Sequence, residues 1–304
     1  MDTNLQQTLQ ERYLAATESF ISKIKTDPNV IAVIICGSLA YDQVWERSDI
    51  DMTVIIRDQH LKTDSYCVIE DDITINVSIA PRSSFKRMLE RSGGGSFAQS
   101  YFSKGKIVYT TDDSLYEYYE ELKHYGSDDI AISVFFDACH LIYIYDKARK
   151  WLRVKKDPIY AQYYLLGAAE VLSNIEVSLS GEPPIREVIQ KALNLNPDLI
   201  TPYYQETMSH HLSEEELERL IEGIDAYLKL HLDVIKKPLI EYMKDQELKT
   251  VTMIAKYFHT EGHYIIGLLD YLAEQGVIAK VSQTIRITPK SKKAVEEIGY
   301  LYIP

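Results

Sequence analysis

The chain has 304 residues, 46% of them hydrophobic, and is long enough for two or three domains that each bury a core. Its 45 acidic and 33 basic residues give a formal net charge of -12, which argues against a surface built throughout to coat nucleic acid and leaves room for a local basic face. The sequence shows neither a signal-peptide pattern nor an apolar run of the roughly 18 residues that a spanning helix needs, so we expect a cytoplasmic protein without a membrane partner.

The first third of the chain alternates helical and strand patterns. Apolar positions at helical spacing predict a helix over residues 5–26, ended by Asp27-Pro28. Val30–Cys36 is a nearly continuous run rich in Ile and Val, which predicts a strand buried on both faces. Further strands are predicted over residues 51–56, 73–79 and 106–109, and a second helix over residues 84–91.

The middle of the chain is helical in its periodicity. From about residue 128 to 247 the apolar spacing is that of helices, interrupted at Gly181-Glu-Pro-Pro and over residues 194–202. This pattern predicts a bundle of four or five helices.

The last sixty residues change character again. They predict a helix containing residues 251–258, a helix over 263–275, a pair of strands over 277–281 and 284–288 joined at Ser282-Gln283, and a final helix. That order resembles a winged helix-turn-helix domain. We therefore predict an α+β chain with a mixed sheet and helices over residues 1–126, an all-α bundle over 127–245 and a small winged-helix domain over 246–304.

The cysteines and the tyrosines give less specific information. The three cysteines, Cys36, Cys67 and Cys139, lie far apart in apolar segments, which predicts buried free thiols and neither a disulfide framework nor a zinc site. The 23 tyrosines either line a cleft or fill helical interfaces.

One segment carries residues suited to chemistry on phosphates. Gly37-Ser38 ends the first buried strand, ten residues follow, and Asp49-Ile50-Asp51 opens the next strand. Residues i and i+2 of a strand point to the same side, so Asp49 and Asp51 present two carboxylates to one point, where a hard divalent cation can be held. The small Gly37-Ser38 pair lets the backbone approach a phosphate, and we count Gly37, Ser38 and Ser48 as nucleotide-binding residues.

Gly-Ser, a ten-residue gap and Asp-x-Asp after a buried strand is the signature of the polymerase-beta-like nucleotidyltransferases, which this chain resembles. It is most similar to the antibiotic-modifying members that act on aminoglycosides and lincosamides, over roughly residues 10–245. The resemblance implies an enzyme dependent on Mg²⁺ or Mn²⁺ that transfers a nucleoside monophosphate to a hydroxyl of a small molecule. Among the nucleoside triphosphates, we expect ATP to be the donor and AMP the group transferred.

The resemblance also implies roles for residues outside the Gly-Ser and Asp-x-Asp motif. In those enzymes a third acidic residue lies on the next strand, where this sequence has Asn76, so we expect Asn76 to be a metal ligand weaker than a carboxylate. Their helical domain can supply a catalytic base, for which Glu170 and Glu176 are the candidates, with an ordinary surface or salt-bridge role left open for both. Among Lys147, Arg149 and Lys150 we choose Lys147 to hold the triphosphate.

Two further segments are predicted to have structural roles and no catalytic one. The run Gly93–Gly95 lacks the lysine and helix of a P-loop and is predicted to be a hinge. The helix over 263–275 has almost no basic side chains, and Asp270 and Glu274 disfavour phosphate, so we expect the C-terminal domain to pack or form a homodimer in preference to binding DNA.

Three functions follow from the sequence. The first is transfer of a nucleoside monophosphate to a small-molecule hydroxyl acceptor, with a nucleoside triphosphate as the other partner. The second is a catalytically weak nucleotide-binding regulator whose winged helix contacts DNA or protein, which Asn76 favours. The third is modification of protein or RNA, where the acidic net charge weighs against long RNA.

Overall fold

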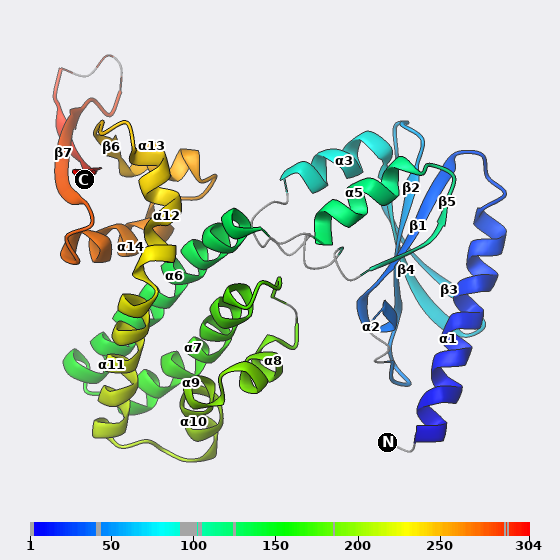
Figure 1. Ribbon diagram of the computed structural model, residues 1–304, viewed down its shortest axis with the longest axis horizontal. Helices are drawn as coiled ribbons and strands as arrows, with labels where there is room; N and C mark the ends of the chain where they lie inside the picture. Colours follow the sequence, from blue (N-terminus) through cyan, green and yellow to red (C-terminus); the bar gives the residue numbers. More distant parts are fainter. Residues whose placement is uncertain are drawn as a thin grey trace. The chain divides into compact units, whose positions relative to one another are not determined.

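The chain folds into two compact units, Met1–Tyr125 and Gly126–Pro304 (Figure 1). The structure, a computed structural model, describes residues 3–40, 44–91, 102, 105–123, 126–184, 186–288, 290 and 292–304. Helices and a mixed sheet occur together, as the predicted α+β class requires.

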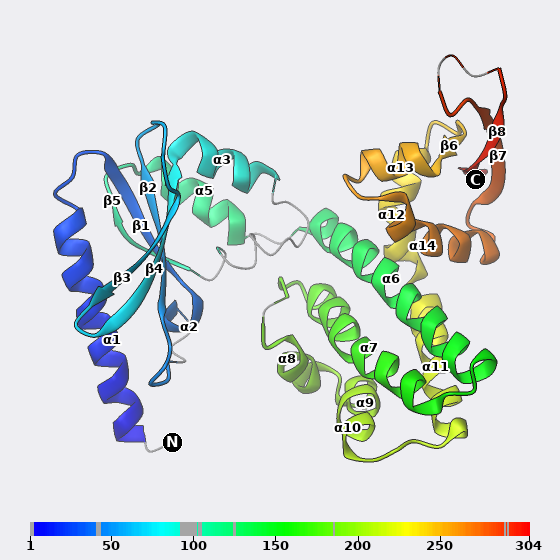
Figure 2. The same ribbon diagram turned by 180° about the vertical axis from the view of Figure 1, so that it is seen from behind.

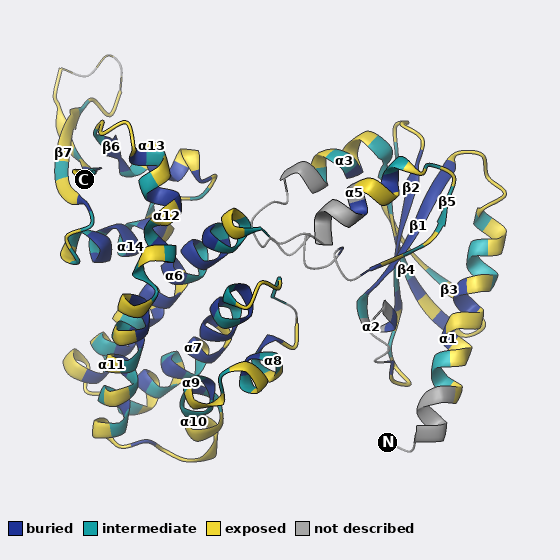
Figure 3. Cartoon of the chain, viewed as in Figure 1, coloured by how far each residue is buried: buried dark blue, intermediate teal, exposed yellow. Residues whose placement is uncertain are grey.

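A five-stranded mixed sheet organises the first unit. Its strands lie in the order β3-β4-β2-β1-β5; β2 and β4 pair in parallel, and the other neighbours pair antiparallel. The sheet places β1 and β2 in the middle, where they are buried along almost their whole length (Figure 3). The strand bounds are β1 Val30–Cys36, β2 Ile50–Ile56, β3 Ser65–Glu70, β4 Ile73–Pro81 and β5 Lys106–Thr110.

Helices cover both faces of this sheet (Figures 1 and 2). On one face α1 packs on Ile50, Met52 and Val54 of β2. On the other face α3 and α5 pack against Ile55. Successive strand residues point to opposite faces, so Asp51 lies on the side of α3 and α5. The helix bounds are α1 Thr3–Ile24, α2 Gly37–Ala40, α3 Arg82–Arg91 and α5 Ser114–Lys123.

The predicted elements of the first unit are confirmed, and two more are present. The strands at β1, β2, β4 and β5 and the helices at α1 and α3 match their predicted ranges to within a few residues. Strand β3 was not predicted because it lies at the edge of the sheet, where its side chains are mostly exposed and no apolar run marks it. Helix α5 was also missed. The predicted hinge at Gly93–Gly95 lies outside the described residues.

The second unit begins with a helical bundle, as predicted, although its described residues form seven helices where four or five were predicted. Helices α6 and α7 run side by side (Figure 2), and α6 continues into a π-helical segment over Lys150–Val154. The predicted breaks are present: Gly181 has a φ of 86°, and Asn196 caps α9 by accepting from the Leu199 backbone N–H. The helix bounds are α6 Ser127–Arg149, α7 Pro158–Leu179, α8 Val188–Leu195, α9 Pro197–Thr201, α10 Thr207–Ser209, α11 Glu214–Leu230 and α12 Leu232–Met243, with a second π-helical segment over Pro202–Glu206.

The end of the chain forms two helices and a three-stranded sheet in the order β6-β8-β7. Its core is continuous with the bundle, since Phe258 stacks on Phe135 of α6 with ring centroids 4.8 Å apart. The predicted boundary between residues 245 and 246 therefore separates segments that share a core, and a separate C-terminal domain remains a prediction. The bounds are β6 Lys249–Thr250, α13 Val251–Tyr257, α14 Gly262–Glu274, β7 Ala279–Ile285 and β8 Val295–Leu301.

The predicted final helix is wrong, because residues 295–301 form strand β8. The predicted turn at Ser282-Gln283 is also wrong, since both residues lie inside β7 and the two strands are joined after Ile285. Tertiary contacts explain the strand: Tyr300 is fully buried opposite β6, and its hydroxyl donates to Asp270 Oδ1 at 2.5 Å. Such packing overrides a local helical pattern.

Candidate functional site

Gly37 stands at the point where β1 turns into the short helix α2. Its φ of 68° lies in the left-handed region that favours glycine. A Cβ atom on Gly37 would also collide with Oδ2 of Asp51 on the neighbouring strand. Both the backbone conformation and the available space therefore require glycine here. The side chain of the next residue, Ser38, lies outside what the structure describes.

Three polar side chains meet beside this turn. Asp51 is paired with Cys36 of β1 on one side and with Asn76 of β4 on the other. Nδ2 of Asn76 donates to Oδ2 of Asp49 at 2.5 Å and to Oδ1 of Asp51 at 3.4 Å. Asp49 is exposed and Asp51 is half-buried. The two carboxylates thus face the same amide group, at an edge of the sheet that solvent reaches.

The side-chain carbonyl oxygen of Asn76 points away from the two carboxylates, toward the edge strand β3. Oδ1 of Asn76 accepts from the thiol of Cys67, which lies opposite it on β3, at 3.1 Å. Asn76 therefore presents its NH₂ group to the carboxylates, and its carbonyl oxygen would reach the same point only after the amide turned over.

The donor set is that of a two-carboxylate cation site. Mg²⁺ takes one or two carboxylates from a protein and completes its octahedron with water and substrate phosphates, so Asp49 and Asp51 fit such an ion. No cluster of three or more His, Cys, Asp or Glu side chains suited to a metal occurs in the described part of the chain. Any cation held here must therefore take more of its ligands from phosphate and water than in a three-carboxylate site.

The turn before Asp49 is held in place by α1. The Tyr13 hydroxyl donates to the backbone oxygen of Ser48 at 2.6 Å and lies 3.3 Å from that of Trp45. Burial raises the pKa of Tyr13, and the nearby Asp49 carboxylate raises it further, so the hydroxyl stays a donor. The Ser48 hydroxyl oxygen accepts from the Trp45 backbone N–H at 3.0 Å. Ser48 thus has a local structural contact, and its predicted contact with nucleotide remains a prediction.

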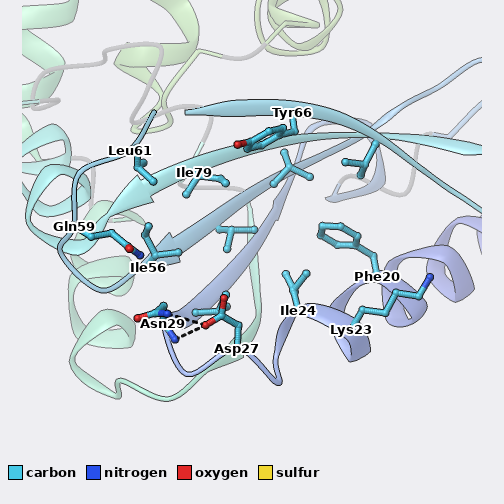
Figure 4. Close-up of a pocket in the computed structure, with 14 residues that line it drawn as sticks. Phe20, Lys23, Ile24, Asp27, Asn29, Ile56, Gln59, Leu61, Tyr66 and Ile79 are labelled. Carbon is cyan, nitrogen blue, oxygen red and sulfur yellow. Dashed lines mark hydrogen bonds between the residues drawn. The ribbon is translucent and has the colours of Figure 1, made fainter. Parts of the chain in front are cut away.

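A cavity of about 520 Å³ lies on the opposite face of the sheet from Asp51 (Figure 4). Phe20 and Ile24 of α1 face Tyr66 and Ile79 across it. The residues of β2 that line the cavity, Val54 and Ile56, point to the opposite face of the sheet from Asp51. The sheet itself therefore separates this apolar cavity from the carboxylates.

The remaining candidate residues belong to the second unit. Glu176 is half-buried, and its two oxygens accept from the Tyr227 hydroxyl at 2.7 Å and from Asn196 Nδ2 at 3.0 Å, which are the contacts of a structural residue. Glu170 is exposed on α7. Lys147 places its ammonium group 5.1 Å from the centre of the Tyr143 ring. The structure thus brings Gly37, Asp49, Asp51 and Asn76 together, whereas the roles of the residues in the second unit remain predictions.

Asp137 on α6 was missed by the sequence analysis. Burial raises its pKa to about 7; Asn174 Nδ2, at 3.5 Å, opposes this shift, and the charge of Glu170 adds to it. A carboxyl group of this kind can take up and release a proton near neutral pH. The signal in the sequence was a single acid within the apolar run VFFDACHLIYIY.

The cysteines follow the prediction in part. Cys36 and Cys139 are buried free thiols, but Cys67 is exposed on the edge strand β3, so the prediction of burial is wrong there. None of the described helices is both long enough and apolar enough to cross a membrane.

Comparison with known families identifies the first unit. Residues 18–114 match the model of the family described as polymerase beta, nucleotidyltransferase. This span, which is less than half of the chain, contains Gly37, Asp49, Asp51 and Asn76, so the cluster lies inside the part that is similar to nucleotidyltransferase domains. A search among curated proteins found no significant relative.

Two solved structures show the range of structural likeness. A nucleotidyltransferase-like protein from Exiguobacterium sibiricum 255-15 is 18% identical, with a TM-score of 0.65 over 95% of this chain and 99% of that chain. The fold is therefore shared along almost the whole chain. The spectinomycin adenyltransferase AAD(9) from Enterococcus faecialis, solved with ATP and spectinomycin, is 12% identical, with a TM-score of 0.31 over 71% of this chain and 99% of that chain. At that TM-score the second likeness carries no conclusion.

Proposed function

We propose that the chain is a nucleotidyltransferase dependent on Mg²⁺ or Mn²⁺ that transfers a nucleoside monophosphate, AMP from ATP in the first instance, to a hydroxyl of a small molecule. The observation that carries the proposal is the convergence of Asp49 and Asp51 beside the Gly37 turn, within a nucleotidyltransferase domain. An acceptor of the aminoglycoside or lincosamide kind is the class we would test first, because the sequence resemblance implies it.

Each residue of the cluster has a distinct task in this proposal. Asp49 and Asp51 hold the cation, which would neutralise charge on the phosphate oxygens when bound. Gly37 leaves the space beside Asp51 open, so that a phosphate can approach the backbone closely. Asn76 donates to both carboxylates and so fixes their directions before a ligand arrives.

A proton acceptor for the hydroxyl is the part that the cluster lacks. In the proposal this base comes from the second unit. We assign it to Glu170 before Glu176, because both oxygens of Glu176 already accept hydrogen bonds while Glu170 is exposed. Lys147 remains our candidate for the triphosphate.

Pyrophosphate release from labelled nucleoside triphosphates, with Mg²⁺ or Mn²⁺ and a panel of hydroxyl acceptors, tests the proposal. We expect the Asp49→Asn, Asp51→Asn double variant to lose transfer by at least about 100-fold, since the charge stabilising the transferred group would be lost. The matched control is the Asp71→Asn, Asp72→Asn double variant, which removes two carboxylates from an exposed turn whose φ values of 50° and 61° suit asparagine. Equal activity in both double variants would refute the proposed site.

The second candidate function is a nucleotide-binding regulator. Asn76 favours it, because a neutral amide stands where a third carboxylate would stand in an efficient enzyme. We infer in addition that the order α12, β6, α13, α14, β7, β8 is that of a winged helix. Asp270 on α14, the third helix of this order, pairs with Lys280 at 2.7 Å, which supports packing over contact with DNA phosphates. Nucleotide binding without transfer to any acceptor would favour the regulator.

A further inference from the structure

Five aromatic side chains gather where α6 leads into α7. Trp151 and Tyr160 lie 4.3 Å apart, measured between ring centroids, and Tyr163 lies 5.6 Å from Tyr160. Tyr164 joins the group at 5.5 Å from Tyr160, and Tyr143 lies 6.3 Å from Tyr164. We call these five residues the aromatic cluster. Its members come from two helices that run side by side, which brings their rings into contact with one another.

Tyr143, Tyr160 and Tyr163 of the aromatic cluster are open to solvent, while Trp151 and Tyr164 are half-buried against the core of the second unit. Tyr143 is 52% exposed and Tyr163 is 65% exposed, which is far above what aromatic residues packed in a helical interface show. Val154 and Ile159, at 72% and 64% exposed, extend the apolar surface along the turn between the helices. A contiguous apolar surface of this kind on a soluble protein marks a binding site more often than chance.

Cations border the aromatic cluster on the same stretch of chain. The ten residues 147–156, KARKWLRVKK, contain six lysines and arginines and no acid, in a chain whose net charge is -12. Arg149 and Arg153 form ion pairs with Asp146 and Glu218. No ion pair is recorded among the described residues for the four lysines of this stretch, which are Lys147, Lys150, Lys155 and Lys156. Lys147 is tied to the cluster itself through the Tyr143 ring.

We propose that the aromatic cluster and these four lysines bind single-stranded nucleic acid. Unpaired bases stack on exposed aromatic rings, and lysines neutralise the phosphates between them, which is how proteins hold single strands without reading a sequence. Exposed rings next to lysines favour a single strand over cationic small molecules, duplexes and acidic peptides. A polyamine or another cationic small molecule is repelled by the lysines, and a duplex hides the faces of its bases. An acidic peptide would use the lysines but leave the rings exposed.

The proposal goes beyond nucleotidyl transfer and does not depend on it. The binding surface lies entirely in the second unit, while the carboxylate cluster lies in the first. Binding is therefore measured without metal or nucleoside triphosphate, so that failure of the catalytic proposal leaves this one testable. The acidic net charge confines contact with a polyanion to the local basic stretch, and strong dependence on salt follows.

Fluorescence anisotropy with a fluorescein-labelled single-stranded RNA of twelve mixed nucleotides and the full chain is the direct test. The variant Tyr143→Ala, Tyr163→Ala removes two exposed rings, and we expect it to weaken binding by about 10-fold or more, as loss of base stacking does. The variant Lys150→Gln, Lys155→Gln should reduce the slope of log K against log salt by about 1.4, since each phosphate contact to a single strand contributes about 0.7.

The matched control is Tyr66→Ala, Tyr116→Ala, which removes two tyrosines that are 50% and 46% exposed in the first unit. Circular dichroism of each variant confirms that it folds. No saturable binding by the wild type, equal weakening in the control, or binding of the matching duplex as tight as that of the single strand would each overturn the proposal. Conversion of a dimer to a monomer by the Tyr143→Ala, Tyr163→Ala variant, without oligonucleotide binding, would also overturn it and assign the surface to a second copy of the chain.

Discussion

Replacing Asn76 with aspartate separates the stability of the carboxylate cluster from its affinity for metal. Asn76 now donates to both Asp49 and Asp51, and Asn76→Asp removes these two hydrogen bonds, worth about 1 kcal/mol each. It also sets a third carboxylate near two others, which costs about 1 kcal/mol per pair at the dielectric constant of water. Without metal we therefore expect the free energy of unfolding to fall by about 4 kcal/mol.

With metal bound, part of this lost stability should return. A third carboxylate adds a charged oxygen ligand, and the number of charged ligands tunes the affinity of hard cations. A tenfold gain in affinity returns about 1.4 kcal/mol of stability when Mg²⁺ is in excess. Urea unfolding with and without 10 mM Mg²⁺, a concentration of about that order being needed to saturate a weak site, measures both changes.

The control is Asn76→Ala, which removes the hydrogen bonds and adds no charge. We expect it to lose stability without metal and to regain less than Asn76→Asp when Mg²⁺ is added. If Asn76→Asp were as stable as the wild type without metal, the geometry of the cluster would be wrong. If Mg²⁺ stabilised Asn76→Asp no more than Asn76→Ala, the side chain at position 76 would not reach the cation.

Three other predictions address single features. Gly37→Ala should lower the affinity for Mg²⁺ and ATP by at least about tenfold in titration calorimetry, because the new Cβ displaces the Asp51 carboxylate and the φ of 68° is strained for alanine; unchanged affinity would contradict this. In the folded state the pKa of Asp137 is raised to about 7, so the contribution of this group to stability is complete below its unfolded pKa and is lost as the pH rises through 7. Between pH 5 and pH 8 the free energy of unfolding of the wild type, measured in urea, should therefore fall by about 2 kcal/mol more than that of Asp137→Asn. Equal losses in the two proteins would refute the raised pKa. The full chain should not bind duplex DNA in the nanomolar range in a gel shift, given Asp270 and Glu274 on α14, and salt-dependent, sequence-selective binding would reverse our preference for packing.

The sequence predicted those parts of the site that depend on local spacing. The run Val30–Cys36 is apolar enough to be a central strand in any context, and the i, i+2 spacing of Asp49 and Asp51 determines that they share a side of β2. The position of Asn76 on the next parallel strand was accessible through the family resemblance. What could not be predicted is the direction of its amide, because that depends on Cys67 of β3, an edge strand with no apolar signature.

The errors at the end of the chain have the same origin. The residues of β8 carry two glutamates and few β-branched side chains, so local propensity favours a helix, and only the burial of Tyr300 against β6 decides for a strand. Similarly, the 23 tyrosines left open whether they line a cleft or fill helical interfaces, and their number alone could not predict that three of them, Tyr143, Tyr160 and Tyr163, are exposed beside Trp151 and Tyr164. Both depend on pairing between segments far apart in the chain.

The amide of Asn76 links the two candidate functions physically. With two carboxylates and a neutral third position, the cluster has too little charge to hold a hard cation firmly by itself, so metal and triphosphate should bind together, each supplying ligands or charge that the other needs. Such mutual dependence suits an enzyme that must release pyrophosphate with its metal, and equally a sensor that must report nucleotide instead of free Mg²⁺. The difference between them therefore lies outside the cluster, in whether a carboxylate such as Glu170 reaches an acceptor hydroxyl, and a search for transfer activity should vary the acceptor before it varies the metal.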